Sequence, residues 1–153
     1  MPKLRMLVAC EKVIMDATSQ VPSLIGIFQG MNVPITDAPL PENPVSPIKW
    51  AFFTIWQHTP DEKGTEYIQR MEVITPSGIP FGKGEARFKV DDDLQSKTST
   101  DLFGLPIGEE GNITIRVWLE GIENASGEYQ FWIKHIRSTK NANPGATISG
   151  SIG

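Results

Sequence analysis

The alternation of apolar and polar residues near the C-terminal end predicts two β-strands joined as a hairpin. In residues 113–120 every second position is apolar, from Ile113 through Ile115 and Val117 to Leu119. Residues 128–135 alternate in the same way, with an apolar side formed by Tyr129, Phe131 and Ile133. A period of two is typical of strands that bury one face. The pattern therefore predicts an antiparallel sheet with one side against a core.

The rest of the chain shows the same pattern in shorter pieces, and it predicts further strands at residues 4–11, 23–33, 48–58, 66–75, 79–81 and 86–90. Residues 48–58 are apolar on both sides, which favours a central strand. Five prolines between residues 34 and 47 predict an extended connection, and residues 91–111 are predicted to form a long loop. No window carries a helical stripe. We therefore expect an all-β fold, an antiparallel β-sandwich of seven to eight strands.

Length and composition favour one globular domain. The chain has 153 residues, of which 39% are hydrophobic and 21% charged. We expect residues 1–137 to form the sandwich and residues 138–153 to form a Gly/Ser/Asn-rich tail. The net charge of −4 argues against a nucleic-acid polymer as partner. No apolar run approaches the roughly 20 residues that span a bilayer, so no membrane association is expected.

The single cysteine, Cys10, excludes an intramolecular disulfide framework. The apolar stretch before it covers only residues 6–9, whereas secretion signals carry an apolar region of about 7–15 residues. A buried strand cysteine in a cytoplasmic protein is the interpretation that follows.

Two motifs near the start of the chain are distinctive: ACEKVIMD at residues 9–16 and SLIGIF at residues 23–28. Together they resemble an uncharacterised family, a domain of unknown function found in small β-sandwich proteins of bacteria and phages. The resemblance is specific over residues 1–33. It implies a β-sandwich fold and the cytoplasm of a bacterium, or of a phage-infected bacterium. It assigns no catalytic residue.

The sequence offers no catalytic or metal-binding motif, so we expect no enzyme, no metal and no cofactor. The two histidines, His58 and His135, lie near predicted strand ends, and no nucleophile motif accompanies them. The aspartates at 91–93 lack calcium-loop spacing and are interpreted as a solvated charge run. Residues 82–84, Gly-Lys-Gly, predict a bulge or tight turn, with an anion-binding nest around Lys83 as the alternative.

Two tryptophans fall on the polar side of the predicted hairpin and are the best functional clue. Trp118 shares its side with Arg116, and Trp132 shares its side with Lys134. Matching the two apolar faces predicts that Trp118 lies opposite Trp132, or two residues from it. Such a surface indicates an interface or ligand site. Cover by the chain's own proline-rich segment or tail is the alternative.

The first functional hypothesis is therefore a non-enzymatic binding module that self-associates through Trp118 and Trp132 into a homo-oligomer. The second is a phage-type sponge that sequesters a small anionic, nucleotide-like signalling ligand. Indoles would stack on the base and cations would meet the phosphates. The candidate residues for this role are Trp118, Trp132, Arg116, Lys134, Lys83, Arg87 and His135. A virion structural or decoration protein is the third hypothesis.

Overall fold

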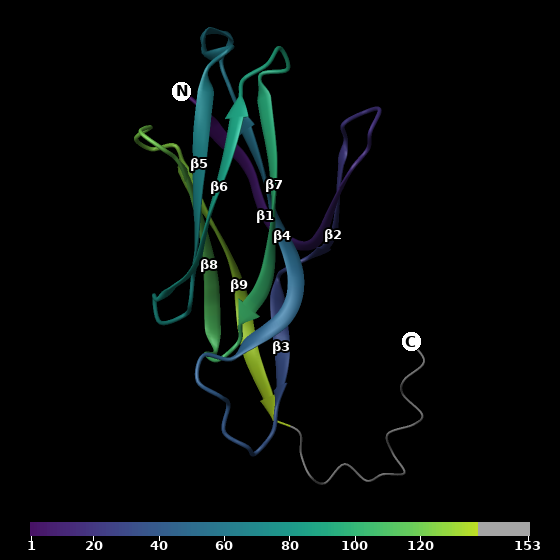
Figure 1. The fold of residues 1–153 in the computed structure, drawn as a ribbon, viewed down its shortest axis with the longest axis vertical. Coiled ribbons are helices and arrows are strands. Elements are labelled where there is room, and N and C mark those ends of the chain that lie inside the picture. Colours follow the sequence, from purple (N-terminus) through teal and green to yellow (C-terminus); the bar gives the residue numbers. More distant parts are fainter. Residues whose placement is uncertain (138–153) are drawn as a thin grey trace.

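Nine strands in two sheets form the described part of the chain, residues 1–137 of a computed structural model (Figure 1). The four strands of the first sheet, called sheet A, follow the order β2 (Pro22–Ile27), β1 (Lys3–Met15), β4 (Val45–Gln57) and β7 (Gln95–Pro106). The five strands of sheet B follow the order β3 (Gly30–Ile35), β9 (Ser126–Arg137), β8 (Gly111–Leu119), β5 (Glu66–Ile74) and β6 (Pro80–Lys89). The predicted tail, residues 138–153, lies outside the described residues.

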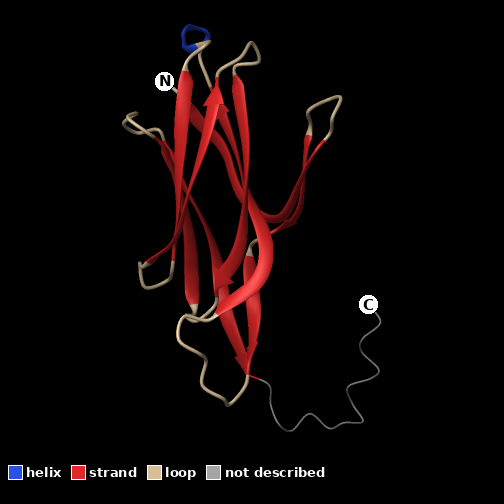
Figure 2. Ribbon diagram, in the orientation of Figure 1, coloured by secondary structure: helices blue, strands red, loops and turns tan. Residues whose placement is uncertain are grey.

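The prediction of an all-β sandwich is confirmed, although there are nine strands rather than seven or eight. The neighbouring strands are antiparallel apart from β3 and β9, which run parallel. Within residues 1–137 the only helical element is a 3₁₀ turn, η1 (Pro60–Glu62), which Figure 2 shows between β4 and β5.

The core lies between the inner faces of the two sheets, and β4 supplies its largest side chains. Trp50, Phe52 and Trp56 alternate along β4 and are fully buried. They meet the apolar side of the C-terminal hairpin, where Phe131 packs edge-on against Trp50 with ring centroids 6.1 Å apart. The prediction that β4 is a central strand is confirmed, because it pairs with β1 on one side and β7 on the other.

The predicted loop at residues 91–111 is wrong, because residues 95–106 form β7 and pair with β4 along its length. The inward positions of β7 include Ser96 and Thr98, which are buried and polar. Their hydroxyls are satisfied by partners on other strands, which removes most of the cost of burial. The sequence of β7 therefore lacks an apolar period of two, although the strand itself is regular.

Two other strand boundaries differ from the prediction. Residues 23–33 form two strands in different sheets, since the chain crosses between sheets at Phe28, which is buried against Trp50 and Phe131. The predicted strands at residues 79–81 and 86–90 are replaced by one strand, β6, which runs from Pro80 to Lys89. The Gly-Lys-Gly segment lies inside β6 instead of forming a turn, and Met71 fills the space beside Gly84. The register shift of this hairpin occurs nearby, between Val73 and Ile74.

Candidate functional site

Trp118 and Trp132 both lie on the outer face of sheet B, but the predicted pairing of the two indoles is wrong. Trp118 pairs with Ser126 and Trp132 pairs with Asn112. Six residues of β8 separate the two positions, which is roughly 20 Å along a strand. The alternation of inward and outward side chains fits this register as well as the predicted one, so it could not exclude it. The hairpin connection decides it, because the Leu119 amide bonds to the Ala125 carbonyl at 2.9 Å and closes the loop there.

The two indoles have different surroundings. Trp132 lies over Gly30 of the neighbouring strand β3, where an added Cβ atom would come within 1.8 Å of the indole Cε2. The indole is 42% exposed. Trp118 is partly buried and lines a shallow hollow together with Lys83 and Arg70. Of the predicted site residues, the structure therefore brings Trp118 and Lys83 together.

The arginines on this face are paired with carboxylates. Arg116 Nε lies 2.9 Å from Glu128 Oε1, and Arg87 Nε lies 2.8 Å from Glu85 Oε1. Arg70, between them, bonds both Glu85 and Glu120. Within residues 1–137 no ion pair forms at Lys83 or Lys134. A bound phosphate would have to compete with these carboxylates, which weakens the case for an anion site on the outer face of sheet B.

His135 lies on the other side of β9, away from the two tryptophans. Its parity is that of the buried residues Phe131 and Ile133, and its Nε2 lies 2.7 Å from the Ile107 carbonyl oxygen. His58 lies at the end of β4 and contacts neither His135 nor its partners. The two histidines therefore belong to separate sites.

His58 is the centre of a buried polar cluster. Its Nε2 lies 2.9 Å from Ser96 Oγ, and its ring stacks on Tyr67 with centroids 5.5 Å apart. Its Nδ1 lies 3.9 Å from Glu62 Oε2 and has no hydrogen-bond partner among the described residues. Sequence reasoning missed Ser96, because the residue was assigned to a loop.

The charges in this cluster are set by burial and hydrogen bonds. Burial lowers the pKa of His58 below 6.5, although Glu62 and Asp91 act in the opposite direction. Burial opposes ionisation of Glu62, but hydrogen bonds from Thr59 and Tyr67 outweigh it and lower its pKa below 4.5. Burial and the bond to Glu62 raise the pKa of Tyr67 to about 12. These shifts favour a neutral His58 imidazole beside an ionised Glu62 carboxylate.

The order Ser96–His58–Glu62 resembles a nucleophile, a base and its orienting acid, but a substrate could not reach these side chains. Ser96 is 6% exposed and the imidazole is fully buried. A catalytic serine must reach a substrate and face oxyanion donors. Ser96 instead lies within the regular pairing of β7 with β4, opposite Trp56. The cluster therefore ties the ends of β4, β5 and β7 together.

The outer face of sheet A carries large exposed apolar side chains, although the charged residues Lys12, Lys97 and Asp101 lie on it as well. The strand register places alternate residues of β2, β1, β4 and β7 on this face. Its large exposed members, here called the sheet A patch, are Met6, Ile14, Ile25, Ile27 and Phe103. Cys10, Ala51 and Phe53 lie on the same face and are buried.

Beyond Cys10, β1 pairs with β2 alone, and together they form a two-stranded arm, residues 11–27, that bends away from the rest of sheet A in Figure 1. At the tip of the arm Lys97 Nζ of β7 donates to the Gln20 carbonyl oxygen at 3.3 Å. The other edge of β2 has no strand beside it in the described structure. The arm therefore joins apolar side chains to an unpaired strand edge.

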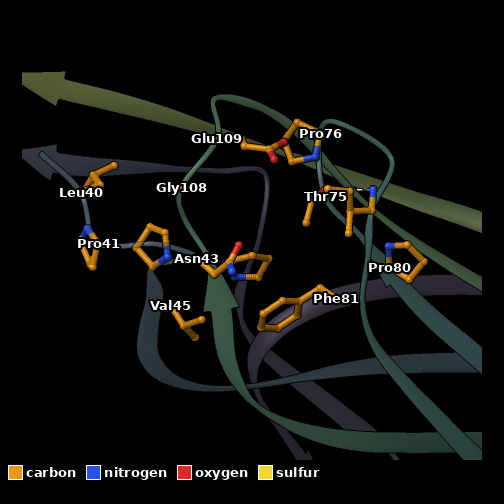
Figure 3. A pocket seen from close by; sticks show the side chains of 13 residues that line it. Leu40, Pro41, Asn43, Val45, Thr75, Pro76, Pro80, Phe81, Gly108 and Glu109 are labelled. Atoms are coloured by element: carbon orange, nitrogen blue, oxygen red, sulfur yellow. Dashed lines mark hydrogen bonds between the residues drawn. The ribbon is translucent and has the colours of Figure 1, made fainter.

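A pocket of about 480 Å³ lies at the end of the sandwich where three connections meet. Figure 3 shows Leu40, Pro41 and Val45 on one side, Thr75, Pro76 and Pro80 on the other, and Phe81 between them. Glu109 closes the pocket from the β7–β8 connection, and its carboxylate accepts bonds of 2.8 Å from the Ser77 amide and hydroxyl. We call it the end pocket. The sequence indicated the proline-rich segment that lines this pocket, but it did not show which residues would lie opposite that segment.

The described residues contain no group of three or more side chains placed to hold a metal ion. No helix in this part of the chain is long and apolar enough to cross a membrane. No protein-family model matches the chain, and no curated protein matches it either.

Proposed function

We propose that this protein is a non-enzymatic binding module that self-associates through the sheet A patch and the β1–β2 arm. The observation that carries the proposal is the contrast between the two outer faces of the sandwich. The arginines on sheet B are paired with carboxylates, whereas sheet A presents Ile25, Ile27 and Phe103 at 46%, 51% and 74% exposure. Several large apolar side chains exposed on one face are typical of protein interfaces.

The free edge of β2 favours a second copy as the partner. An unpaired strand edge is a template for another strand, and a two-fold axis would pair two β2 edges antiparallel. This would join the two copies of sheet A into one continuous sheet. A stable interface buries about 800 Å² on each partner, so the side chains of the patch must add to the edge contact.

The self-association surface proposed here lies on sheet A, whereas the sequence hypothesis placed it at the two tryptophans. Trp132 is occupied in covering Gly30, and Trp118 lies among the paired charges of Arg70, Glu85 and Glu120. Surface ion pairs contribute only about 0–1 kcal/mol each. Burying them in an interface without exchanging partners would cost more than that.

Sedimentation velocity tests the proposal. We expect the wild-type protein to sediment as a dimer or larger species, and the Ile25→Ser/Ile27→Ser variant to sediment as a monomer of 16.9 kDa. Both substitutions lie on exposed positions of an edge strand, so the sandwich should remain folded, which circular dichroism would verify.

The matched control is Ile136→Ser, because Ile136 is 43% exposed but belongs to β9 of sheet B. It should sediment as the wild type does. A wild-type protein that remains monomeric at about 100 μM, where interfaces with Kd values in the micromolar range would be occupied, would contradict the proposal. So would a double variant that keeps the wild-type mass.

A further inference from the structure

The end pocket lies apart from the sheet A patch and has the features of a preformed binding site. Its volume of about 480 Å³ falls in the range of ligand pockets, which is roughly 300–1,000 Å³. Loops at the ends of a sandwich often carry binding sites, since the sheets hold them in place.

The walls of the pocket are rigid and tied to one another. Proline rings from all three connections line it: Pro41, Pro44, Pro76, Pro80 and Pro106. Each ring fixes its backbone φ angle. The Ile107 amide donates to the Pro44 carbonyl at 3.1 Å, and Glu109 holds the turn at Ser77. Binding of a ligand would therefore cost little conformational entropy, because the walls of the pocket are already ordered.

The pocket leaves apolar side chains exposed that an occupant would bury. Ile79 and Phe81 contribute from the β5–β6 hairpin, and Leu40 and Val45 contribute from the opposite wall. All four are at least 40% exposed. The occupant must therefore offer a large apolar group.

The rim of the pocket is acidic. Glu109 lines it, and Glu42 lies between the lining residues Pro41 and Asn43 in the chain. No lysine or arginine is among the lining residues that the structure describes. Complementary charge on the ligand is therefore positive.

Strand edges next to the pocket favour a peptide over a small molecule. Pro80 and Phe81 begin β6, the edge strand of sheet B, and Pro106 ends β7, the edge strand of sheet A. Neither edge is hydrogen-bonded to a further strand among the described residues. An extended peptide binds such edges with its own backbone and places alternate side chains in pockets.

We propose that the end pocket binds an extended peptide segment of a partner protein, which inserts one large apolar side chain next to a lysine or arginine. The proposal rests on the function proposed above in treating the protein as a binding module. It adds a surface whose lining residues include none of the sheet A patch, so the two can fail separately.

A phage-displayed library of random heptapeptides, selected on the immobilised full chain, tests the proposal. We expect enriched peptides to share a large apolar residue beside Lys or Arg. A synthetic, fluorescein-labelled copy of the enriched sequence then gives a Kd by fluorescence polarisation. Phe81→Ser should raise this Kd about tenfold or more, because a buried aromatic contact is lost.

Further variants separate the alternatives. Ile79→Ser, at a turn outside the core, should weaken binding in the same direction even if Phe81→Ser folds poorly. Glu42→Gln should weaken binding severalfold and reduce its salt dependence. Ile136→Ser should bind as the wild type does, and Ile25→Ser/Ile27→Ser should bind the peptide while losing self-association.

The proposal is overturned if no peptide is enriched, or if the enriched peptides lack a basic residue. It is also overturned if Phe81→Ser and Ile79→Ser leave the Kd unchanged. Enriched sequences that match residues 11–27 of this chain would overturn it in favour of a second copy, whose arm would then be the occupant.

Discussion

At the scale of single residues, the interior of this sandwich depends on a few polar groups that hydrogen-bond to one another. Gln69 of β5 accepts from Trp56 Nε1 at 2.6 Å and from Thr54 Oγ1 at 2.8 Å, and its Nε2 donates to Thr98 Oγ1 at 3.1 Å. These bonds link the inner faces of the two sheets. A buried network of this kind stabilises one arrangement only while each member keeps its partners.

The Gln69→Met substitution tests this dependence. It keeps a similar volume but leaves the Trp56 N–H without its acceptor, while the Thr54 hydroxyl keeps only Thr98 as a partner. We expect the free energy of unfolding to fall by about 2–4 kcal/mol, since buried donors lose their bonds. Urea denaturation would measure it. Gln130→Met, at an exposed position on β9, should change stability by less than about 0.5 kcal/mol.

His58 predicts a pH dependence of stability with a definite sign. Burial lowers its folded-state pKa below 6.5, against the charges of Glu62 and Asp91 and together with that of the Met1 amino group. As the pH falls below 6.5, the unfolded chain binds a proton that the folded chain does not. Stability is therefore highest above pH 6.5 and declines below it.

The pKa of Glu62 is lowered from 4.5, so its contribution is present above pH 4.5 and is lost only in more acidic solution. The decline between pH 6.5 and 4.5 should then belong to His58. Urea titrations across this range should show a clear slope for the wild type and a flatter one for His58→Gln. An equal slope in both proteins would refute the assignment.

At the scale of elements, side-chain parity follows the sequence, whereas register follows the contacts between strands. The parallel pair of β3 and β9 illustrates this. Gly30 lies beside Trp132, and the indole occupies the space where a Cβ atom would be. A glycine at this position lets a large aromatic side chain cover the backbone of the edge strand.

Gly30→Ala should displace the Trp132 indole and destabilise the protein by about 1–3 kcal/mol, because the new methyl group overlaps the ring. In the Trp132→Ala background the same change should cost much less. A double-mutant cycle from urea denaturation would measure the coupling. Gly82→Ala is the control, since nothing lies within 4 Å of its added Cβ atom. Additive effects of the two substitutions would argue against the contact.

At the scale of the whole molecule, the sandwich has two dissimilar outer faces and one pocketed end. If the sheet A patch binds a second copy, only the folded state associates, and association stabilises it by mass action. Stability should then depend on protein concentration. A stability that depends on protein concentration distinguishes specific self-association from weak, nonspecific contacts between molecules.

We expect the Tm of the wild-type protein to rise as its concentration is raised from about 1 to 100 μM, since more of the folded chain is then associated. The Ile25→Ser/Ile27→Ser variant should melt at one temperature throughout that range. Differential scanning fluorimetry would measure both. A wild-type Tm that does not change with concentration would remove the support for a stable oligomer.

Much of the fold was predictable from the sequence, because β-strands with one buried face carry their signature in alternation. The hairpin of β8 and β9 was predicted with the correct inward residues, and β4 was predicted as central. β7 was missed because its inward residues Ser96 and Thr98 are polar and are satisfied only by partners distant in the chain. The end pocket was missed for a related reason, since its three connections meet only after folding.

The sequence by itself determined the fold class and, in strands with a clear alternation such as β8 and β9, the face on which each residue lies. Both follow from local rules, the period of two and the turn chemistry. The tertiary structure decided which strands are neighbours, that the two tryptophans lie far apart, and that apolar residues of β1, β2 and β7 share one outer face. These depend on pairing between distant segments, which is set by the packing of the whole core and leaves no local pattern.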